Sequence, residues 1–276
     1  MPSLVFLAAR VNNDTLANCV NFLAFALLVV WWQRGGWRWW LAALVVIGVG
    51  LLTKSTALLL LAVAMVAALL RPMTPWKLKA QWAGAGLLIV GLLAGWLAVR
   101  RMREGQRQLV ANLATSSPAM KLTDNRADFV TFNPARVAAE PYNYGLFRMP
   151  DRDHFWEYWF RSALFGQFTF PQAPRWLAQT MAVTGMATVV AALFSLALGL
   201  RHWRESLPFV LLLVVSVAGH IAYVVSAPFA ASHDFRYSLM VLLPAAWALG
   251  RSQRLAFVAI PFVLLTMVFL IWVSCC

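Results

Sequence analysis

The sequence has few acidic residues, few charged residues of any kind and few cysteines. Only 12% of its 276 residues are charged and 62% are hydrophobic, whereas a soluble globular domain has about 25% charged and about 45–50% apolar residues. The three cysteines, Cys19, Cys275 and Cys276, show no spacing typical of a metal or redox site. These shortages exclude an ordinary soluble domain and give no sign of cysteine chemistry.

Acidic residues are scarcest in the first part of the chain. Asp14 is the only acid in the first hundred residues, and it stands at the start of a long apolar run. A carboxylate beside a membrane is costly and is usually kept for chemistry or ion pairing. Two interpretations stay open: Asp14 caps the helix that follows, or it is a functional carboxylate that binds a sugar hydroxyl, a metal or a catalytic partner.

Long apolar runs take the place of the missing charge, and the mean hydropathy is +0.70. The runs are long enough for membrane-spanning helices rather than barrel strands, so we expect an all-α, polytopic bundle forming a single membrane domain over residues 1–276. No signal peptide is expected, since the apolar stretch Leu4–Ala9 is short and Arg10 follows it. The eight predicted helices are 15–32, 38–53, 55–70, 82–99, 177–200, 207–228, 238–250 and 254–274.

Basic residues predict how the chain threads through the membrane. Four short connections between the apolar runs contain a single acid, Glu205, and nine bases. The bases are Arg34, Arg38, Arg71, Lys77, Lys79, Arg201, Arg204, Arg251 and Arg254. Short loops rich in Lys and Arg stay in the cytoplasm, so the N-terminus, Lys54, the long segment 100–176 and the turn 229–237 are expected on the outer face.

Lys54 lies in the sequence Thr53-Lys54-Ser55-Thr56, which joins the second and third predicted helices with almost no loop. One interpretation is a lysine that extends its amine to the membrane surface. The other is a phosphate ligand, because hydroxyl residues flank the cation and lead into a helix N-terminus, which favours anions. A lipid-linked phosphate at the membrane surface suits the second interpretation.

A second polar group, Asp234, Arg236 and Tyr237, precedes the seventh predicted helix. These side chains together can bind a diphosphate or a sugar, with Arg236 as a bidentate partner. The alternative is an Asp–Arg ion pair with an interfacial tyrosine. If the threading is right, Asp14, Lys54 and this group share the outer face, and we expect them to contribute to one site.

The outer segment 100–176 is the only extended polar region. An aromatic-rich helix is expected to start near 151, with an acid at its cap, and to lie in the membrane interface. Asp151, Asp153, His154 and Glu157 form a conceivable metal cluster, but helix capping and pairing with arginine explain these acids more simply, so no metal site is predicted. His220 is expected to make an interhelical hydrogen bond.

Two runs, Ala9–Ala17 and Gly48–Leu58, separated by an apolar span and an Arg/Trp-rich turn, resemble family 39-like membrane glycosyltransferases of the C-type superfamily. That grouping includes protein O-mannosyltransferases and lipid A aminoarabinose transferases. Trp156–Phe168, and Asp234–Tyr237 before a helix that contains Pro244, are similar to later parts of such chains.

The resemblance implies an inverting enzyme that takes a sugar from a polyprenyl-phosphate donor on the outer side of a membrane, here the bacterial inner membrane. The acceptor is a glycan, lipid or protein, and no nucleic acid is involved. Lys54 matches the basic position near the donor phosphate. Asp14 matches a later, supporting acid, because the general base of the family lies in the first outer loop. No cofactor is certain, although the chemistry admits a divalent cation.

The sequence departs from the family pattern at its start. The first span, the outer loop with its acidic motif and the next spans are missing, so we expect the chain to be a C-terminal part that lacks the principal base. The alternatives from other classes are a non-catalytic membrane scaffold and a lipid or solute transporter. A transporter is the less favoured of these, because the charges lie at the ends of the spans and no repeat is evident.

Overall fold

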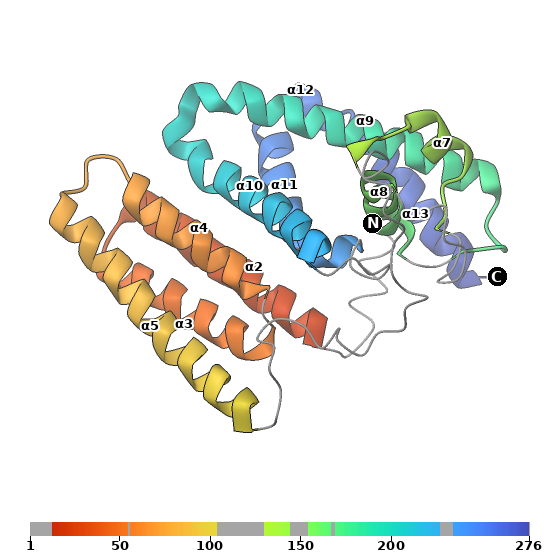
Figure 1. Cartoon of the computed structure of the whole chain (residues 1–276). Coiled ribbons are helices and arrows are strands. Elements are labelled where there is room, and N and C mark those ends of the chain that lie inside the picture. The colour runs from red at the N-terminus through yellow and green to blue at the C-terminus, as the bar shows by residue number, and fades with distance from the viewer. Residues whose placement is uncertain are drawn as a thin grey trace. The chain divides into compact units, whose positions relative to one another are not determined.

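The computed structural model describes residues 13–54, 56–103, 130–143, 154–166, 169–226 and 234–275, and every regular element in these ranges is helical (Figure 1). The predicted all-α class is therefore confirmed. The elements are α2 (Asn13–Arg34), α3 (Trp37–Thr53), α4 (Ala57–Leu70), α5 (Trp76–Arg103), α7 (Pro134–Ala139), α8 (Phe155–Phe165), α9 (Arg175–Gly199), η4 (Leu200–His202), α10 (Trp203–Ser226), η6 (Phe235–Val241), α11 (Leu242–Arg251), α12 (Gln253–Ala256) and α13 (Ala259–Cys275).

Several of these helices are apolar enough to cross a membrane. Three segments of the described chain have sufficient length and hydropathy: Thr15–Arg34, Arg175–Val225 and Gln253–Ser274. Trp37–Thr53 and Ala57–Leu70 are apolar but shorter. The helical membrane character agrees with the sequence, while the count of eight spans stays a prediction.

Two predicted helices begin or break differently from expectation, and a proline lies near each change. The segment predicted as 238–250 starts in a 3₁₀ turn with non-helical φ/ψ at Ser238, and α11 begins two residues before Pro244. The segment predicted as 254–274 is interrupted between α12 and α13, and α13 begins two residues before Pro261. Proline cannot donate a backbone hydrogen bond and is tolerated in the first turn of a helix, which explains where both α-helices start.

The described residues fall into two compact units, so the single membrane domain over 1–276 stays a prediction. The N-terminal unit contains residues 13–54, 56–103 and 200–219. The C-terminal unit contains residues 130–143, 154–166, 169–199, 220–226 and 234–275.

Tryptophan dominates one end of the core of the N-terminal unit. Trp31, Trp40 and Trp82, from α2, α3 and α5, are fully buried. Trp31 lies 4.5 Å from Trp40 and 4.9 Å from Trp82 between ring centroids, and Trp40 donates its indole hydrogen to the carbonyl oxygen of Trp82 at 3.2 Å. Aromatic pairs at such distances contribute beyond the area that they bury, so this cluster joins the three helices.

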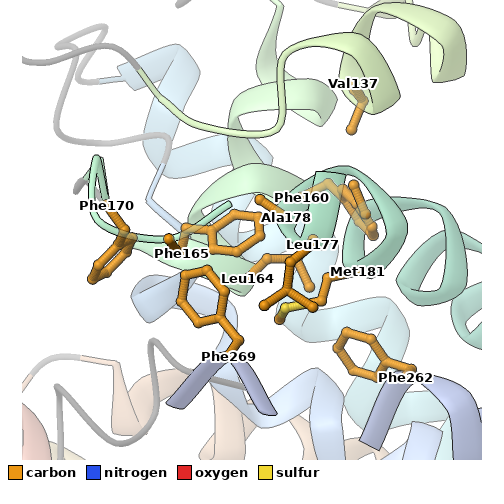
Figure 2. Packing of buried hydrophobic residues seen from close by; sticks show 12 residues of the cluster. Val137, Phe160, Leu164, Phe165, Phe170, Leu177, Ala178, Met181, Phe262 and Phe269 are labelled. Carbon is orange, nitrogen blue, oxygen red and sulfur yellow. The ribbon is translucent and has the colours of Figure 1, made fainter. Parts of the chain in front are cut away.

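Phenylalanine and aliphatic side chains form the core of the C-terminal unit (Figure 2). Phe165 and Phe269 lie 5.4 Å apart between ring centroids, and Phe170 lies 5.2 Å from Phe269. The cluster joins α7, α8, α9 and α13. The predicted aromatic helix is present as α8, but Phe155, Tyr158 and other aromatic side chains of it are buried inside this unit. They therefore serve as core residues, and the position of α8 in the membrane interface stays a prediction.

Candidate functional site

Lys54 lies in a very tight turn between two helices of the N-terminal unit, as the sequence predicts. Helix α3 ends at Thr53, and α4 begins at Ala57. The backbone nitrogen of Lys54 donates to the carbonyl oxygen of Gly50 at 2.8 Å, and its own carbonyl accepts from Ala57 at 3.2 Å. Both the entry and the exit of the turn are thus hydrogen-bonded, so the backbone at the half-buried Lys54 is fixed.

The same turn packs closely against α2. A Cβ atom at Gly50 would lie 2.9 Å from Cβ of Ala57 and 3.1 Å from Oδ1 of Asn21. Glycine is therefore required at position 50 for α2, α3 and α4 to approach. Asn21 is buried, and within the described part of the chain its Oδ1 atom accepts no hydrogen bond, so a polar acceptor lies beside the Lys54 turn.

Asp14 lies in the first turn of α2, which begins at Asn13. The N-terminal end of a helix carries partial positive charge, which favours a carboxylate there. This position is consistent with both interpretations of Asp14, and its role stays a prediction. Ser55 and His233 lie outside the described residues.

Asp234, Arg236 and Tyr237 come together in the C-terminal unit at the start of η6. Asp234 caps η6 by accepting from the backbone nitrogen of Arg236 at 2.9 Å, and its Oδ2 lies 3.9 Å from Nε of Arg236. The Nη2 atom of Arg236 donates to the hydroxyl of Tyr237 at 3.3 Å, and the guanidinium lies 5.0 Å from the centre of that ring. The ion pair that the sequence analysis gave as the alternative to ligand binding is therefore present.

The side chain of Arg236 is partly accessible to a ligand. The side chain of Arg236 is 30% exposed, whereas that of Asp234 is 10% exposed. The Tyr237 ring lies 5.1 Å from that of Tyr223 in α10. Chemically, the group offers a cation and two phenol rings on one side and a carboxylate already engaged by Arg236 on the other, which suits binding an anion or a sugar better than removing a proton.

Two serines that the sequence analysis did not single out hold this group in place. The Ser162 hydroxyl of α8 accepts from the backbone nitrogen of Phe235 at 2.9 Å and donates to the carbonyl of Trp159. The Ser238 hydroxyl accepts from the indole of Trp159 at 2.5 Å and lies 3.1 Å from Nδ1 of His220. The predicted interhelical hydrogen bond of His220 is thus confirmed.

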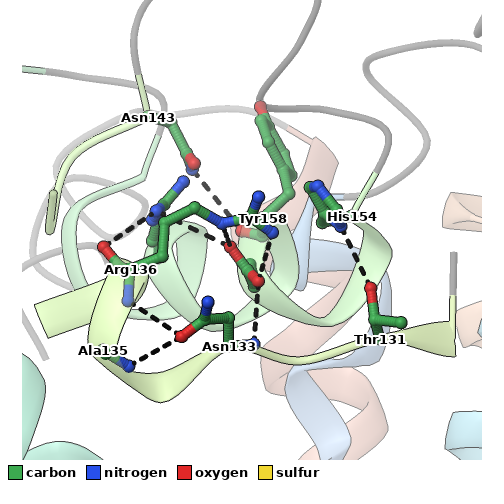
Figure 3. A network of polar contacts seen from close by, with 9 residues as sticks. Thr131, Asn133, Ala135, Arg136, Asn143, His154 and Tyr158 are labelled. Carbon is green, nitrogen blue, oxygen red and sulfur yellow. Dashed lines mark hydrogen bonds and ion pairs between the residues drawn. The ribbon is translucent and has the colours of Figure 1, made fainter. Parts of the chain in front are cut away.

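Figure 3 shows a network of polar contacts that includes Asn133 and Arg136. The buried Glu157 of α8 is at its centre. Its two carboxylate oxygens accept from Nε and Nη2 of Arg136 at 2.7 and 2.5 Å, and Oε1 also accepts from the backbone nitrogen of Asn133 at 2.9 Å. Nη2 of Arg161 lies 3.7 Å from Oε2. The bidentate geometry is the strong form of such a pair, and it links α7 to α8 across 21 residues of sequence.

This network favours the ionised form of the Glu157 carboxyl group. Burial alone raises the pKa of its carboxyl group, but the hydrogen bonds from Arg136 and Asn133 and the charges of Arg136 and Arg161 outweigh it, so the pKa lies below its ordinary value. A carboxylate with this pKa and these partners is unsuited to act as a general base.

The predicted pairing of Glu157 with arginine is therefore confirmed. Asp151 and Asp153, the other acids of the conceivable metal cluster, lie outside the described residues. His154 has Nδ1 3.2 Å from the hydroxyl of Thr131. Among the described residues, no three His, Cys, Asp or Glu side chains are placed to bind a metal ion.

Of the predicted site residues, the structure brings Asp234, Arg236 and Tyr237 together in the C-terminal unit. Asp14 and Lys54 belong to the N-terminal unit, and a site shared by the two groups stays a prediction. Ser162 and Ser238 carry no sequence signal, because a serine in an apolar segment is common. Trp159 belongs to the aromatic run, but its hydrogen bond to Ser238 depends on the tertiary fold.

The first part of the chain is similar to a known protein family. Residues 1–98 match the family model described as dolichyl-phosphate-mannose-protein mannosyltransferase. The matched segment contains Asp14, Lys54 and helices α2 to α4, and it ends before the Asp234 group. No curated protein and no solved structure matches the chain. Together with the apolar helices, the match supports an integral membrane protein of the glycosyltransferase type.

Proposed function

We propose that this chain is a membrane glycosyltransferase, or the C-terminal part of one, that transfers a sugar from a polyprenyl-phosphate donor to an acceptor. The acceptor is a glycan, lipid or protein at the outer face of a bacterial inner membrane. The observation that carries the proposal is the match of residues 1–98 to a mannosyltransferase family model. The membrane-spanning helices agree with a lipid-linked donor.

Lys54 is assigned to the donor phosphate. Its backbone is fixed by hydrogen bonds to Gly50 and Ala57, so its side chain extends from a fixed point next to the N-terminus of α4. The dipole at a helix N-terminus also favours an anion there. Rigid placement matters because electrostatic stabilisation of a leaving group requires charges that need no reorganisation.

Arg236 and Tyr237 are assigned to the binding of donor or acceptor in the C-terminal unit. The exposed part of the Arg236 guanidinium can bind a phosphate oxygen, and the faces of Tyr237 and Tyr223 offer apolar surface to a sugar ring. Asp234 supports Arg236 by ion pairing at 3.9 Å. Because the carboxylate faces its own arginine, we assign it a positioning role.

The proposed reaction is a direct displacement at the anomeric carbon. A carboxylate accepts the proton of the acceptor hydroxyl, the hydroxyl oxygen bonds to the anomeric carbon, and the bond from that carbon to the phosphate oxygen breaks. The polyprenyl phosphate leaves with the electron pair, and we propose that Lys54 and Arg236 each stabilise negative charge on phosphate oxygens. Asp14 is proposed as a supporting acid rather than as the principal base, and the proposal includes no divalent cation.

The test measures donor binding and sugar transfer separately, with the purified chain in lipid nanodiscs. Polyprenyl-phosphate-linked mannose is one probe, and the corresponding aminoarabinose donor is another. We expect Lys54→Ala and Arg236→Ala each to weaken donor binding about tenfold, as for the loss of a hydrogen bond to a charged group. Arg254→Ala is the matched control, since the replaced side chain is exposed and has no part in the assigned site.

The outcomes are distinguishable. Wild-type donor affinity in both Lys54→Ala and Arg236→Ala would contradict the assignment of these residues. Donor binding without transfer by the wild-type chain would favour a scaffold that needs a companion chain. Absence of donor binding by the wild-type chain would contradict the proposed function itself.

A further inference from the structure

Three connections of the N-terminal unit meet at one end of it. Arg71, after α4, has its guanidinium 5.1 Å from the ring of Trp31 in the last turns of α2 and donates to the carbonyl of Trp32 at 3.4 Å. The indole of Trp32 donates to the carbonyl of Arg204 in the first turn of α10 at 2.5 Å. The ends of α2, α4 and α10 are therefore neighbours, and the starts of α3 and α5 follow directly from α2 and α4.

This end of the unit exposes cations from all three connections. Arg34 and Arg38 flank the α2–α3 turn, Lys77 lies in the first turn of α5, and Arg201 and Arg204 flank the start of α10. All five are exposed, and we call them the basic patch. Glu205 is the only acid in the described parts of these three connections, so the charge of the patch is largely uncompensated by protein.

Exposed tryptophans alternate with these cations. Trp37, Trp76 and Trp203 stand beside the bases in each of the three connections and are 39%, 70% and 47% exposed. Exposed tryptophan at helix ends is typical of the boundary between hydrocarbon and lipid headgroups. The combination of apolar rings and cations at one level identifies the patch as a surface that contacts a bilayer leaflet.

The surface also contains a depression. A cavity of about 330 Å³ opens at the start of α10 and is lined by the five consecutive residues from Arg201 to Glu205. It is open to the surface, and its lining residues include two arginines and the acid Glu205. Clusters of bases at the cytoplasmic ends of membrane helices bind anionic headgroups, whereas a zwitterionic headgroup brings its own cation and gains less.

We propose that the basic patch is a binding site for anionic phospholipid headgroups in the leaflet at that end of the N-terminal unit. In the threading predicted from the sequence, this is the cytoplasmic leaflet. The site is distinct from the proposed donor-binding residues Lys54 and Arg236, so its existence does not depend on the proposed function. The same bases also orient the chain during insertion, but that role requires no selective binding by the mature protein.

The experiment titrates the purified full chain in detergent micelles with phosphatidylglycerol or phosphatidylcholine and measures bound lipid by native mass spectrometry. We expect tighter binding of phosphatidylglycerol, weakening as salt is added because the charges are exposed. The double variants Arg34→Gln/Arg38→Gln and Arg201→Gln/Arg204→Gln are each expected to weaken phosphatidylglycerol binding about tenfold or more, since each base near an anionic surface contributes roughly a fivefold factor.

Two controls separate charge from packing and from general electrostatics. Arg34→Lys/Arg38→Lys keeps both charges and is expected to keep phosphatidylglycerol affinity within about threefold of wild type. Arg251→Gln/Arg254→Gln removes the same amount of charge from another basic turn, in the C-terminal unit. It is expected to weaken phosphatidylglycerol binding less than either patch variant does, because that turn has two bases rather than five. Circular dichroism of each variant verifies helix content.

Three results would overturn the proposal. The first is equal affinity of the wild-type chain for the two lipids. The second is an equal loss of phosphatidylglycerol binding in the Arg251/Arg254 variant. The third is displacement of phosphatidylglycerol by inorganic phosphate at low millimolar concentration, which would assign the patch to soluble anions. If a patch variant loses helix content, the lysine variant and the wild-type lipid preference still decide the question.

Discussion

The two units stabilise partly or fully buried arginine side chains in different ways. In the N-terminal unit, the Arg71 guanidinium lies 5.1 Å from the Trp31 ring and 5.2 Å from the Trp82 ring. In the C-terminal unit, Arg136 and Arg161 face the carboxylate of Glu157. The difference follows the distribution of acids, because Asp14 is the only one in the first hundred residues. Where carboxylates are absent, aromatic faces and backbone carbonyls take their place.

The choice of partner has consequences for stability. Burial lowers the pKa of the Arg71 guanidinium, but arginine stays protonated in proteins, and a tryptophan ring does not titrate. The Glu157 network contains a titratable partner and, if that partner is removed, leaves a buried cation. We therefore expect the C-terminal unit to be more sensitive to both mutation and pH.

The largest effect is expected from removing the carboxylate. Glu157→Ala leaves Arg161, which is 1% exposed, without its acidic neighbour, and breaking a buried ion pair costs about 3–5 kcal/mol. The measurement is the free energy of unfolding in mixed micelles. Glu205→Ala, which removes an exposed carboxylate, is the control. A cost below about 1 kcal/mol, as for a surface pair, would show that the network does not stabilise the unit.

A smaller effect is expected from removing the aromatic-bound cation. Arg71→Ala eliminates two cation–π contacts and should cost about 2 kcal/mol. Arg38→Ala, which removes an exposed arginine 5.2 Å from the single ring of Trp39, should cost less than about 1 kcal/mol. Unfolding monitored by tryptophan fluorescence gives both values. Equal costs for the two variants would show that the two cation–π contacts of Arg71 stabilise the protein no more than the single contact of the exposed Arg38.

Gly35 tests how closely Arg71 is held. Its φ is +73°, and an added Cβ would lie 2.8 Å from Nη2 of Arg71, whereas Gly36 has φ +88° and open space around it. Both glycines have positive φ, and Gly36 has ψ +143°, so each alanine substitution should cost about 1–3 kcal/mol for the backbone; Gly35→Ala also meets Arg71. In an Arg71→Ala background the cost of Gly35→Ala should fall while that of Gly36→Ala stays the same, and an unchanged cost of Gly35→Ala would contradict the contact.

The smallest effect is expected from pH. Because the folded-state pKa of Glu157 lies below its unfolded value, its ionised form contributes stability above the unfolded pKa, near 4.5, and that stability is lost as pH falls through the folded pKa. The difference in melting temperature between wild type and Glu157→Gln should shrink as the pH is lowered from 7 toward 3. The difference between wild type and Arg71→Ala should stay constant, and parallel changes would contradict the comparison.

The sequence was sufficient to predict the helices but not their contacts. Apolar runs predict where α2 to α5 lie because membrane helices need continuous hydrophobicity. The start of α11 and the break before α13 depend on where Pro244 and Pro261 end the hydrogen-bond ladder, which hydropathy alone does not show. The pairing of Glu157 with Arg136 requires α7 to fold back on α8, so it depends on a tertiary contact.

For the candidate site, the sequence likewise predicted the local features but not the contacts between residues far apart in the chain. The short linker predicts the tight turn at Lys54, and the sequence Asp234–Tyr237 predicts an ion pair, because both are local features. The supporting hydroxyls of Ser162 and Ser238 could not be identified, since their partners are distant in sequence. Features formed by residues close together in the sequence could thus be predicted, whereas hydrogen bonds from residues distant in sequence could not.

The Ser238 hydroxyl has a further consequence for His220. Its neighbours are the indole N–H of Trp159, which only donates, the carbonyl oxygen of Phe235 at 3.2 Å, which only accepts, and Nδ1 of His220. With its single proton directed to Phe235, the hydroxyl can only accept from the imidazole. This arrangement corresponds to the His220 tautomer with hydrogen on Nδ1, whereas a hydroxyl that donates to Nδ1 corresponds to the other tautomer and leaves the Phe235 carbonyl without this hydrogen bond.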